Sequence, residues 1–117
     1  MTRAGAVGRD VHRRATEVID ATEFAGRFIH GLGHSIGLDV HDVGDYKVGG
    51  EWRVLEPGMV LTVEPGLYIA AGSKGVARKW WNIGVRIEDD VLVTRNGHDV
   101  LSKNVPKQVD EIEALMA

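Results

Sequence analysis

The sequence predicts one α+β domain in which a curved antiparallel sheet carries helices on one side. An amphipathic helical pattern opens the chain, and a shorter one closes it. Between them lie apolar, β-branched tracts bounded by Pro-Gly and Asn-Gly turn signals. This order of elements is typical of helices packed against an antiparallel sheet. The 117 residues suffice for a single domain with a modest core.

The two helices are predicted over residues 7–22 and 106–117. In the first, apolar residues recur at helical spacing and charged residues occupy the rest of the surface, which predicts one buried face. This apolar set is Val7, Val11, Ala15, Val18 and Ile19. The second helix opens at Pro106 and repeats apolar residues at Val109, Ile112 and Leu115 or Met116.

The strands are predicted in the second half of the chain. Residues 59–64, MVLTVE, have the length and composition of a strand that enters a tight turn. In the tract WNIGVRIEDDVLVT, Val85 and Ile87 alternate with Arg86 and Glu88, so the two pairs face opposite sides. The Asn-Gly signal at residues 96–97 predicts a hairpin after this tract.

Residues 30–42, HGLGHSIGLDVHD, combine three histidines, two aspartates and three glycines. Glycine disfavours a helix, and Gly31 stands where a helical zinc protease needs glutamate, so His30 and His34 do not form such a zinc pair. In an extended segment, His34 and residues 37–41 could line a crevice where the glycines let the backbone approach a ligand. A single histidine here is better interpreted as structural, but three favour a site.

The loop AAGSKGVARKWWN, residues 70–82, is basic and contains two adjacent tryptophans. It is interpreted either as a lid or contact surface, or as a loop anchored by one buried tryptophan.

Composition narrows the function classes. Without cysteine, the strong metal ligands are histidine, aspartate and glutamate. A net charge of -3 disfavours nucleic acid as a partner, and the absence of a run of about 20 apolar residues argues against a membrane span. The first fourteen residues lack the apolar stretch of a secretory signal, so a cytoplasmic location is expected.

Two glutamates occupy unusual positions for packing. Glu64 ends an apolar strand just before Pro65, and Glu88 shares a face with Arg86. Taken singly, such a glutamate is best interpreted as part of an ordinary ion pair, either across strands or with a residue on the same face. Taken together, one histidine, two glutamates and an arginine form a set that suits Mn, Fe, Co or Zn.

Three segments, HGLGHSIGLDVHDVG, LEPGMVLTVEPGLYI and GVRIEDDVLVT, occur in this order. They resemble the carboxyl-terminal signatures of the pita-bread metallopeptidases, most closely those of aminopeptidase P (Xaa-Pro aminopeptidase) and next those of the Xaa-Pro dipeptidases. The resemblance implies a partial pita-bread fold. It also implies that residues 1–117 are the carboxyl-terminal half of the catalytic domain, without the upstream half and the amino-terminal domain.

The resemblance also implies roles for individual residues. His34, Glu64 and Glu88 would bind metal, Glu88 would bridge two ions, and Glu64 would help accept a proton from the nucleophilic water. His41 would bind the substrate carbonyl or stabilise the tetrahedral intermediate, and His30 would contact substrate near the proline. Arg86 would hold the carboxylates and the histidine in register. Two ions, commonly Mn²⁺ with Co, Zn or Fe as alternatives, would share the attacking hydroxide. The substrate would be a peptide with proline at its second position.

The family's two remaining ligands are aspartates on an upstream hairpin. Asp10 and Asp20 do not replace them, because they share no face of the predicted helix. An aminopeptidase fragment that is inactive alone is therefore expected, completed by another chain or acting in a homo-oligomer. The alternatives are an Xaa-Pro dipeptidase and a non-catalytic binding module derived from the pita-bread fold. A cupin-like metal enzyme would need a His-x-His pair, which the sequence lacks.

Overall fold

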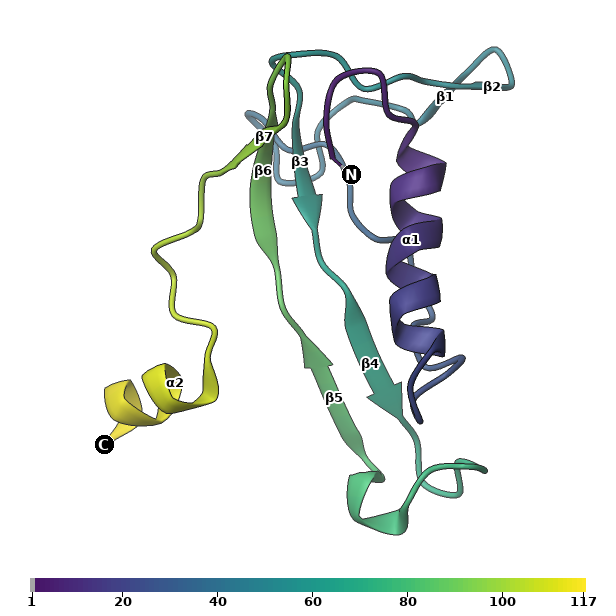
Figure 1. Cartoon of the computed structure of the whole chain (residues 1–117), viewed down its shortest axis with the longest axis vertical. Coiled ribbons are helices and arrows are strands. Elements are labelled where there is room, and N and C mark those ends of the chain that lie inside the picture. The colour runs from purple at the N-terminus through teal and green to yellow at the C-terminus, as the bar shows by residue number, and fades with distance from the viewer. Residues whose placement is uncertain (1) are drawn as a thin grey trace.

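The computed structural model describes residues 2–117 and has α+β architecture (Figure 1). The elements are α1 (Gly8–Asp20), β1 (Lys47–Val48), β2 (Glu51–Trp52), β3 (Val60–Val63), β4 (Gly66–Ile69), the 3₁₀ helix η1 (Arg78–Trp80), β5 (Ile83–Arg86), β6 (Asp89–Val93), β7 (His98–Val100) and α2 (Val109–Met116). The predicted combination of two α-helices with short antiparallel strands is confirmed, but only α1 packs on the sheet, so the prediction that both helices lie against one side of it is wrong for α2.

The sheet is a long antiparallel ribbon that is interrupted near its middle. Strand β3 pairs with β6 and strand β4 pairs with β5, so each side of the ribbon is two strands in succession (Figure 1). The interruptions fall at residues 64–65 on one side and 87–88 on the other. Both halves keep one register, with Val63 opposite Asp89 and Gly66 opposite Arg86. Continuing that register across the gap places Glu64 directly opposite Glu88.

Strand β7 widens the ribbon at the end formed by β3 and β6. It pairs with β6 in an antiparallel hairpin whose turn contains residues 96–97, which confirms the predicted Asn-Gly hairpin. The strand predicted over residues 59–64 is also confirmed, as β3.

The glycine-rich segment runs extended along the free edge of β3, so its predicted non-helical conformation is confirmed. A side-chain carbon at Gly33 would collide with the backbone carbonyl of Thr62. From the sequence, the glycines are expected to let the backbone approach a ligand. In the structure, Gly33 lets the backbone of residues 32–36 approach strand β3. Three backbone hydrogen bonds join the segments, from the N–H groups of Glu64, Thr62 and Ile36 to the carbonyls of Leu32, His34 and Val60.

The core lies between the ribbon and the segment before α1. Leu55, Leu61 and Val93 form the buried cluster, and Val11 of α1 packs against it. The helix predicted over residues 7–22 is thus confirmed, but its apolar face is only half covered: none of its residues is fully buried and Val18 is 53% exposed. An apolar pocket of about 270 Å³ lies between the start of α1 and β3.

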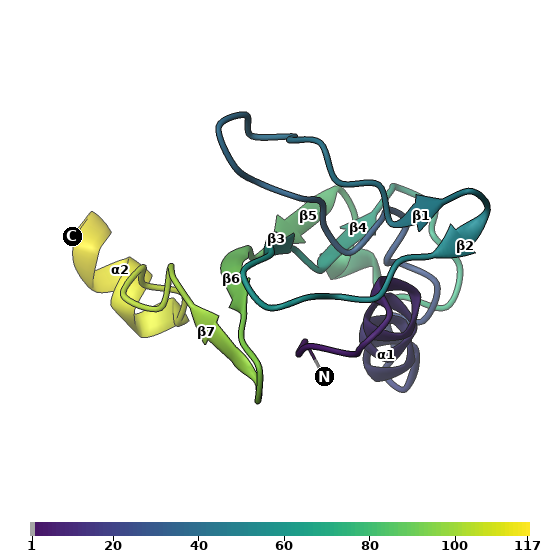
Figure 2. The ribbon, with the colours of Figure 1, turned by 90° about the horizontal axis from the view of Figure 1, so that it is seen from above.

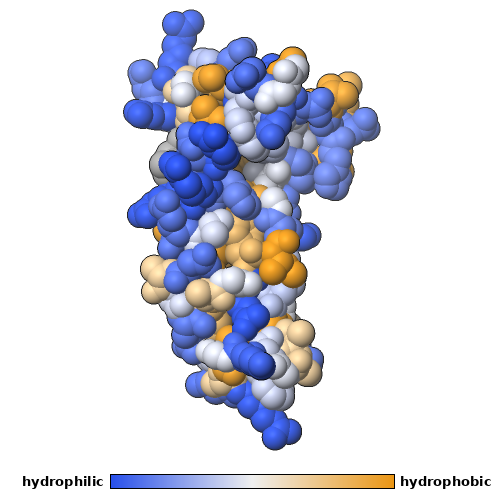
Figure 3. Space-filling model, turned by 90° about the vertical axis from the view of Figure 1, so that its right-hand side faces the viewer, coloured by the Kyte–Doolittle hydropathy of each residue, from blue (hydrophilic) through white to orange (hydrophobic). Residues whose placement is uncertain are grey.

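The second helix lies apart from the first. Figures 1 and 2 show α1 beside the ribbon and α2 at the far end of an extended carboxyl-terminal segment. Every residue of α2 is exposed, so α1 is the helix that covers the ribbon. The face drawn in Figure 3 is mostly hydrophilic, with apolar patches between the charged side chains. No helix within residues 2–117 combines the length and apolar character needed to cross a bilayer.

The loop over residues 70–82 contains η1 and is held by its aromatic side chains. Both Trp80 and Trp81 are half-buried, and Trp80 packs edge-on against Phe24 with ring centroids 6.1 Å apart. These contacts support the interpretation of an anchored loop, with two tryptophans partly buried instead of one fully buried.

Candidate metal centre

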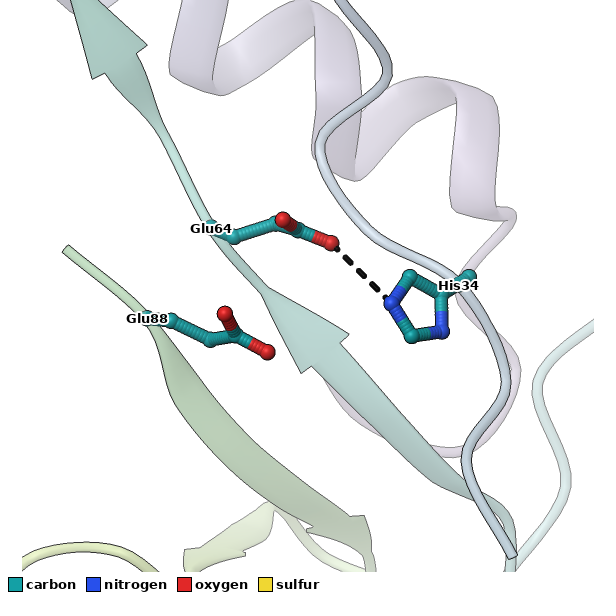
Figure 4. A group of neighbouring side chains, drawn as sticks. All are labelled: His34, Glu64 and Glu88. Carbon is teal, nitrogen blue, oxygen red and sulfur yellow. Dashed lines mark ion pairs between the residues drawn. The ribbon is translucent and has the colours of Figure 1, made fainter. Parts of the chain in front are cut away.

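Three predicted ligands meet where the ribbon is interrupted. His34, Glu64 and Glu88 each offer one ligand atom, and these atoms lie within 4.8 Å of one another (Figure 4). His34 comes from the extended segment beside β3, Glu64 from the gap between β3 and β4, and Glu88 from the gap between β5 and β6. Three distant parts of the sequence therefore supply one cluster.

The shared register of the ribbon accounts for the meeting of the two glutamates. Like charges directly opposite each other in an antiparallel pair are destabilising, so two facing carboxylates are a poor choice for stability alone. A divalent cation between them removes the repulsion. One imidazole nitrogen with two carboxylates is also a donor set that first-row divalent metals accept. The residues present therefore fit such an ion.

The contacts of the two ring nitrogens of His34 direct Nε2 toward the Glu64 carboxylate. Its Nδ1 lies 3.0 Å from the carbonyl oxygen of Ser35, which can only accept, so Nδ1 carries a proton. Nε2 lies 3.3 Å from Oε1 of Glu64. With Nδ1 as the donor to Ser35, Nε2 is the ring nitrogen that faces the carboxylate and could bind a metal ion. Metal-binding histidines commonly donate their other N–H to a backbone carbonyl in this way.

Glu64 is buried and held at both carboxylate oxygens. The residue is 8% exposed, the Thr62 hydroxyl donates to its Oε1 at 2.9 Å, and Arg86 Nε lies 3.4 Å from its Oε2. Burial of the Tyr46 phenol and, to a smaller extent, the negative charge of Glu64 raise the pKa of Tyr46.

Arg86 forms one of the two kinds of ion pair that the sequence allowed, the one across the strands. A pair with Glu88 was the other, because both residues face the same side. Among residues 2–117 the arginine contacts Glu64 instead, and Glu88 is exposed with neither a hydrogen bond nor an ion pair. Register explains the difference: Arg86 lies opposite Gly66, which places its side chain diagonal to Glu64.

The other two predicted histidines have different neighbours: His41 contacts the ligand His34, and His30 lies beside Tyr68 and Gly66. The His41 ring stacks on His34, with centroids 4.0 Å apart and planes at 30°. The His30 ring meets Tyr68 edge-on at 5.4 Å, and a side-chain carbon at Gly66 would come within 2.9 Å of its Nε2. That nitrogen is buried and has no hydrogen-bond partner within residues 2–117.

Sequence reasoning missed Thr62 and Tyr46 as neighbours of the cluster. Thr62 carried a usable signal, since it is a polar residue in an apolar strand and lies two positions before Glu64, on the same face. Tyr46 carried none. As predicted, Asp10 and Asp20 do not join the cluster: Asp10 pairs with Arg13, and Asp20 accepts the N–H of Gly26.

Comparison with known protein families identifies the family of this chain. The sequence model of metallopeptidase family M24 matches residues 1–95, which is most of the chain. The chain belongs to this family. Among curated M24 relatives, the Xaa-Pro aminopeptidase of Escherichia coli is 56% identical over 89 residues. The match takes in 76% of this chain and 20% of the relative, so the chain spans about a fifth of that protein.

Solved structures of M24 peptidases have the same fold. Aminopeptidase PepP of Pseudomonas aeruginosa matches 98% of this chain and 30% of its own, with 50% identity and a TM-score of 0.86. A zinc-substituted E. coli aminopeptidase P in complex with product matches 99% of this chain and 30% of its own, with 40% identity and a TM-score of 0.85. The predicted resemblance to aminopeptidase P and the pita-bread fold is thereby confirmed.

Proposed function

We propose that this chain supplies metal ligands and substrate-binding residues to an Xaa-Pro aminopeptidase. Such an enzyme hydrolyses the bond between the amino-terminal residue of a peptide and the proline that follows. The observation that carries the proposal is the meeting of His34, Glu64 and Glu88 within 4.8 Å. The 56% identity to the E. coli Xaa-Pro aminopeptidase supports the choice of reaction and of substrate over an Xaa-Pro dipeptidase.

Divalent metal would be held by His34 Nε2 and by the carboxylates of Glu64 and Glu88. We expect manganese, with cobalt, zinc or iron as alternatives, because the donor set is nitrogen and oxygen only. When bound, divalent ions act as Lewis acids that make water nucleophilic near neutral pH and stabilise the developing oxyanion.

The remaining roles belong to the side chains around the cluster. Glu64 accepts the proton that the attacking water loses, and Arg86 keeps that carboxylate in place through its contact with Oε2. His41, stacked on His34, would bind the substrate carbonyl or stabilise the tetrahedral intermediate. His30 contacts the substrate near its proline.

Three protein ligands leave much of a two-metal site unfilled. We propose that residues 1–117 correspond to the carboxyl-terminal half of the catalytic domain, and that carboxylates from outside these residues complete the site, either in the same polypeptide or in another chain. Assembly with a second chain or copy would also cover apolar residues such as Val85, which is 52% exposed. By itself this stretch is expected to bind metal weakly and to have little or no peptidase activity.

A chimera tests this function directly. The matching part of the E. coli enzyme is replaced by this chain, and Mn²⁺-dependent release of the amino-terminal residue from an Xaa-Pro peptide is measured. We expect activity that Glu64→Gln and Glu88→Gln abolish, with unmodified E. coli enzyme as the control. A folded chimera that is inactive with Mn²⁺, Co²⁺ and Zn²⁺ would contradict the proposal and favour a non-catalytic binding module.

A further inference from the structure

One hydroxyl group connects two of the proposed ligands. Thr62 is 2% exposed, and its Oγ1 lies 2.9 Å from the backbone nitrogen of His34 and 2.9 Å from Oε1 of Glu64. The backbone N–H of Thr62 in turn donates to the carbonyl of His34 at 2.9 Å. Thr62 therefore holds the main chain of one ligand and the side chain of the other.

The direction of each hydrogen bond follows from the chemistry of the groups. The N–H of His34 can only donate, so the hydroxyl oxygen accepts there. The single hydroxyl hydrogen is then available for the carboxylate, which accepts. Oε1 of Glu64 is fixed by Thr62 and Oε2 by Arg86, but the arginine side chain is 52% exposed. The buried hydroxyl is the firmer of the two restraints, because solvent and salt screen the exposed one.

We propose that Thr62 is a positioning residue, whose hydroxyl aims the Glu64 carboxylate at His34 and thereby sets the affinity of the cluster for a divalent cation. This inference rests on the proposed metal site and deepens it. Valine at this position would keep the shape and the strand preference, but the part-buried N–H of His34 would lose its acceptor and Oε1 of Glu64 would lose its donor. Serine would keep the hydroxyl and lose a methyl group.

The test compares Thr62→Val with Thr62→Ser in the 117-residue chain. Thr16→Val is the matched control, because the Thr16 hydroxyl also bonds a backbone group, the His12 carbonyl, in a helix away from the cluster. Mn²⁺ dissociation constants are measured by electron paramagnetic resonance. We expect Thr62→Val to weaken binding about 10-fold or more, as outer partners of metal ligands commonly do, and the other two variants to stay near wild type. Equal affinity of Thr62→Val and wild type would overturn the proposal.

A second measurement uses metal-free protein. In a crystal structure of Thr62→Val the Glu64 carboxylate should turn away from His34, and amide exchange at His34 should accelerate, whereas Thr62→Ser should match wild type. If the Glu64 carboxylate keeps its position in Thr62→Val, the inference about Thr62 is overturned. If the wild-type chain binds no cation, that result counts against the proposed function, and the crystal structure still tests the role of Thr62. If Thr62→Val fails to fold, Thr62→Ala takes its place. A wild-type crystal structure with Oγ1 out of hydrogen-bonding range of Glu64 would also overturn it.

Discussion

Glu64 and Glu88 face each other across the same ribbon, yet their surroundings differ. Glu64 is 8% exposed and each of its carboxylate oxygens has a partner, whereas Glu88 is exposed and has none within residues 2–117. The backbone N–H of Glu64 also donates to the carbonyl of Leu32, in the segment that covers the outer edge of β3. Every residue of β5, which precedes Glu88, is exposed. One carboxylate is thus oriented before any ion binds, and the orientation of the other is left to the ion.

The largest effect is expected from Glu64→Gln. The substitution keeps the shape of the side chain but removes the charge that attracts the ion and the ion pair with Arg86. Mn²⁺ affinity should fall by more than about 100-fold, beyond the range for residues outside the ligand set. Isothermal titration calorimetry measures this, and a loss smaller than that of Glu88→Gln would reverse the contrast between the two residues.

Glu88→Gln separates metal affinity from stability. Affinity should fall as well, because a ligand charge is lost. The metal-free protein should unfold at the same temperature or a higher one, since the change removes repulsion between facing carboxylates, worth roughly 0.2–1 kcal/mol. Thermal unfolding in a chelating buffer measures this. A clear drop in melting temperature would mean that Glu88 has a stabilising partner and is not the unrestrained residue described above.

A smaller effect is expected from Arg86→Ala, because half of this side chain is in solvent. Mn²⁺ affinity should fall only a few-fold, and the difference from wild type should shrink at high salt as the contact is screened. Titrations at low and high NaCl measure it. A loss as large as that of Thr62→Val would show that Arg86, not the buried hydroxyl, is the main restraint on Glu64.

The smallest effect concerns Asp89, the residue after Glu88. Burial raises its pKa, but the Ser102 hydroxyl and the Lys107 ammonium outweigh that effect and bring the pKa below its ordinary value of 3.8. A depressed pKa in the folded state stabilises the fold above that value, and the contribution is lost as the pH falls through the folded-state pKa. Asp89→Asn should cost less than about 1 kcal/mol near pH 6 because the pair is partly exposed. The variant and wild type should converge in thermal unfolding once the pH is below the folded-state pKa of Asp89, and a difference that persists in strong acid would contradict this explanation.

Much of this arrangement could be predicted from local sequence. Periodicity located α1, length and composition located β3, the Asn-Gly signal located the hairpin of β6 and β7, and the glycine content excluded a helix in residues 30–42. These features depend on neighbouring residues in the chain, which a sequence displays directly. The resemblance to the pita-bread family selected the residues that the structure brings into one cluster.

What could not be predicted depends on pairing between distant segments. Alternation showed that Arg86 and Glu88 share a face, but the register across the ribbon decides that Arg86 contacts Glu64. The part played by Thr62 depends on the approach of Gly33 to β3, which no spacing in the sequence displays. The exposure of α2 likewise depends on the path of the segment before it, which Lys107 ties to Asp89.

The most direct test of the metal centre is anomalous diffraction from crystals of this chain soaked in a large excess of Zn²⁺, and then of Mn²⁺, so that even a weak site is filled. A peak bonded to His34 Nε2 and to carboxylate oxygens of Glu64 and Glu88, at about 2.0–2.2 Å for zinc, is the predicted result. A peak elsewhere, or none while the three side chains keep their positions, would contradict the assignment of these residues as metal ligands.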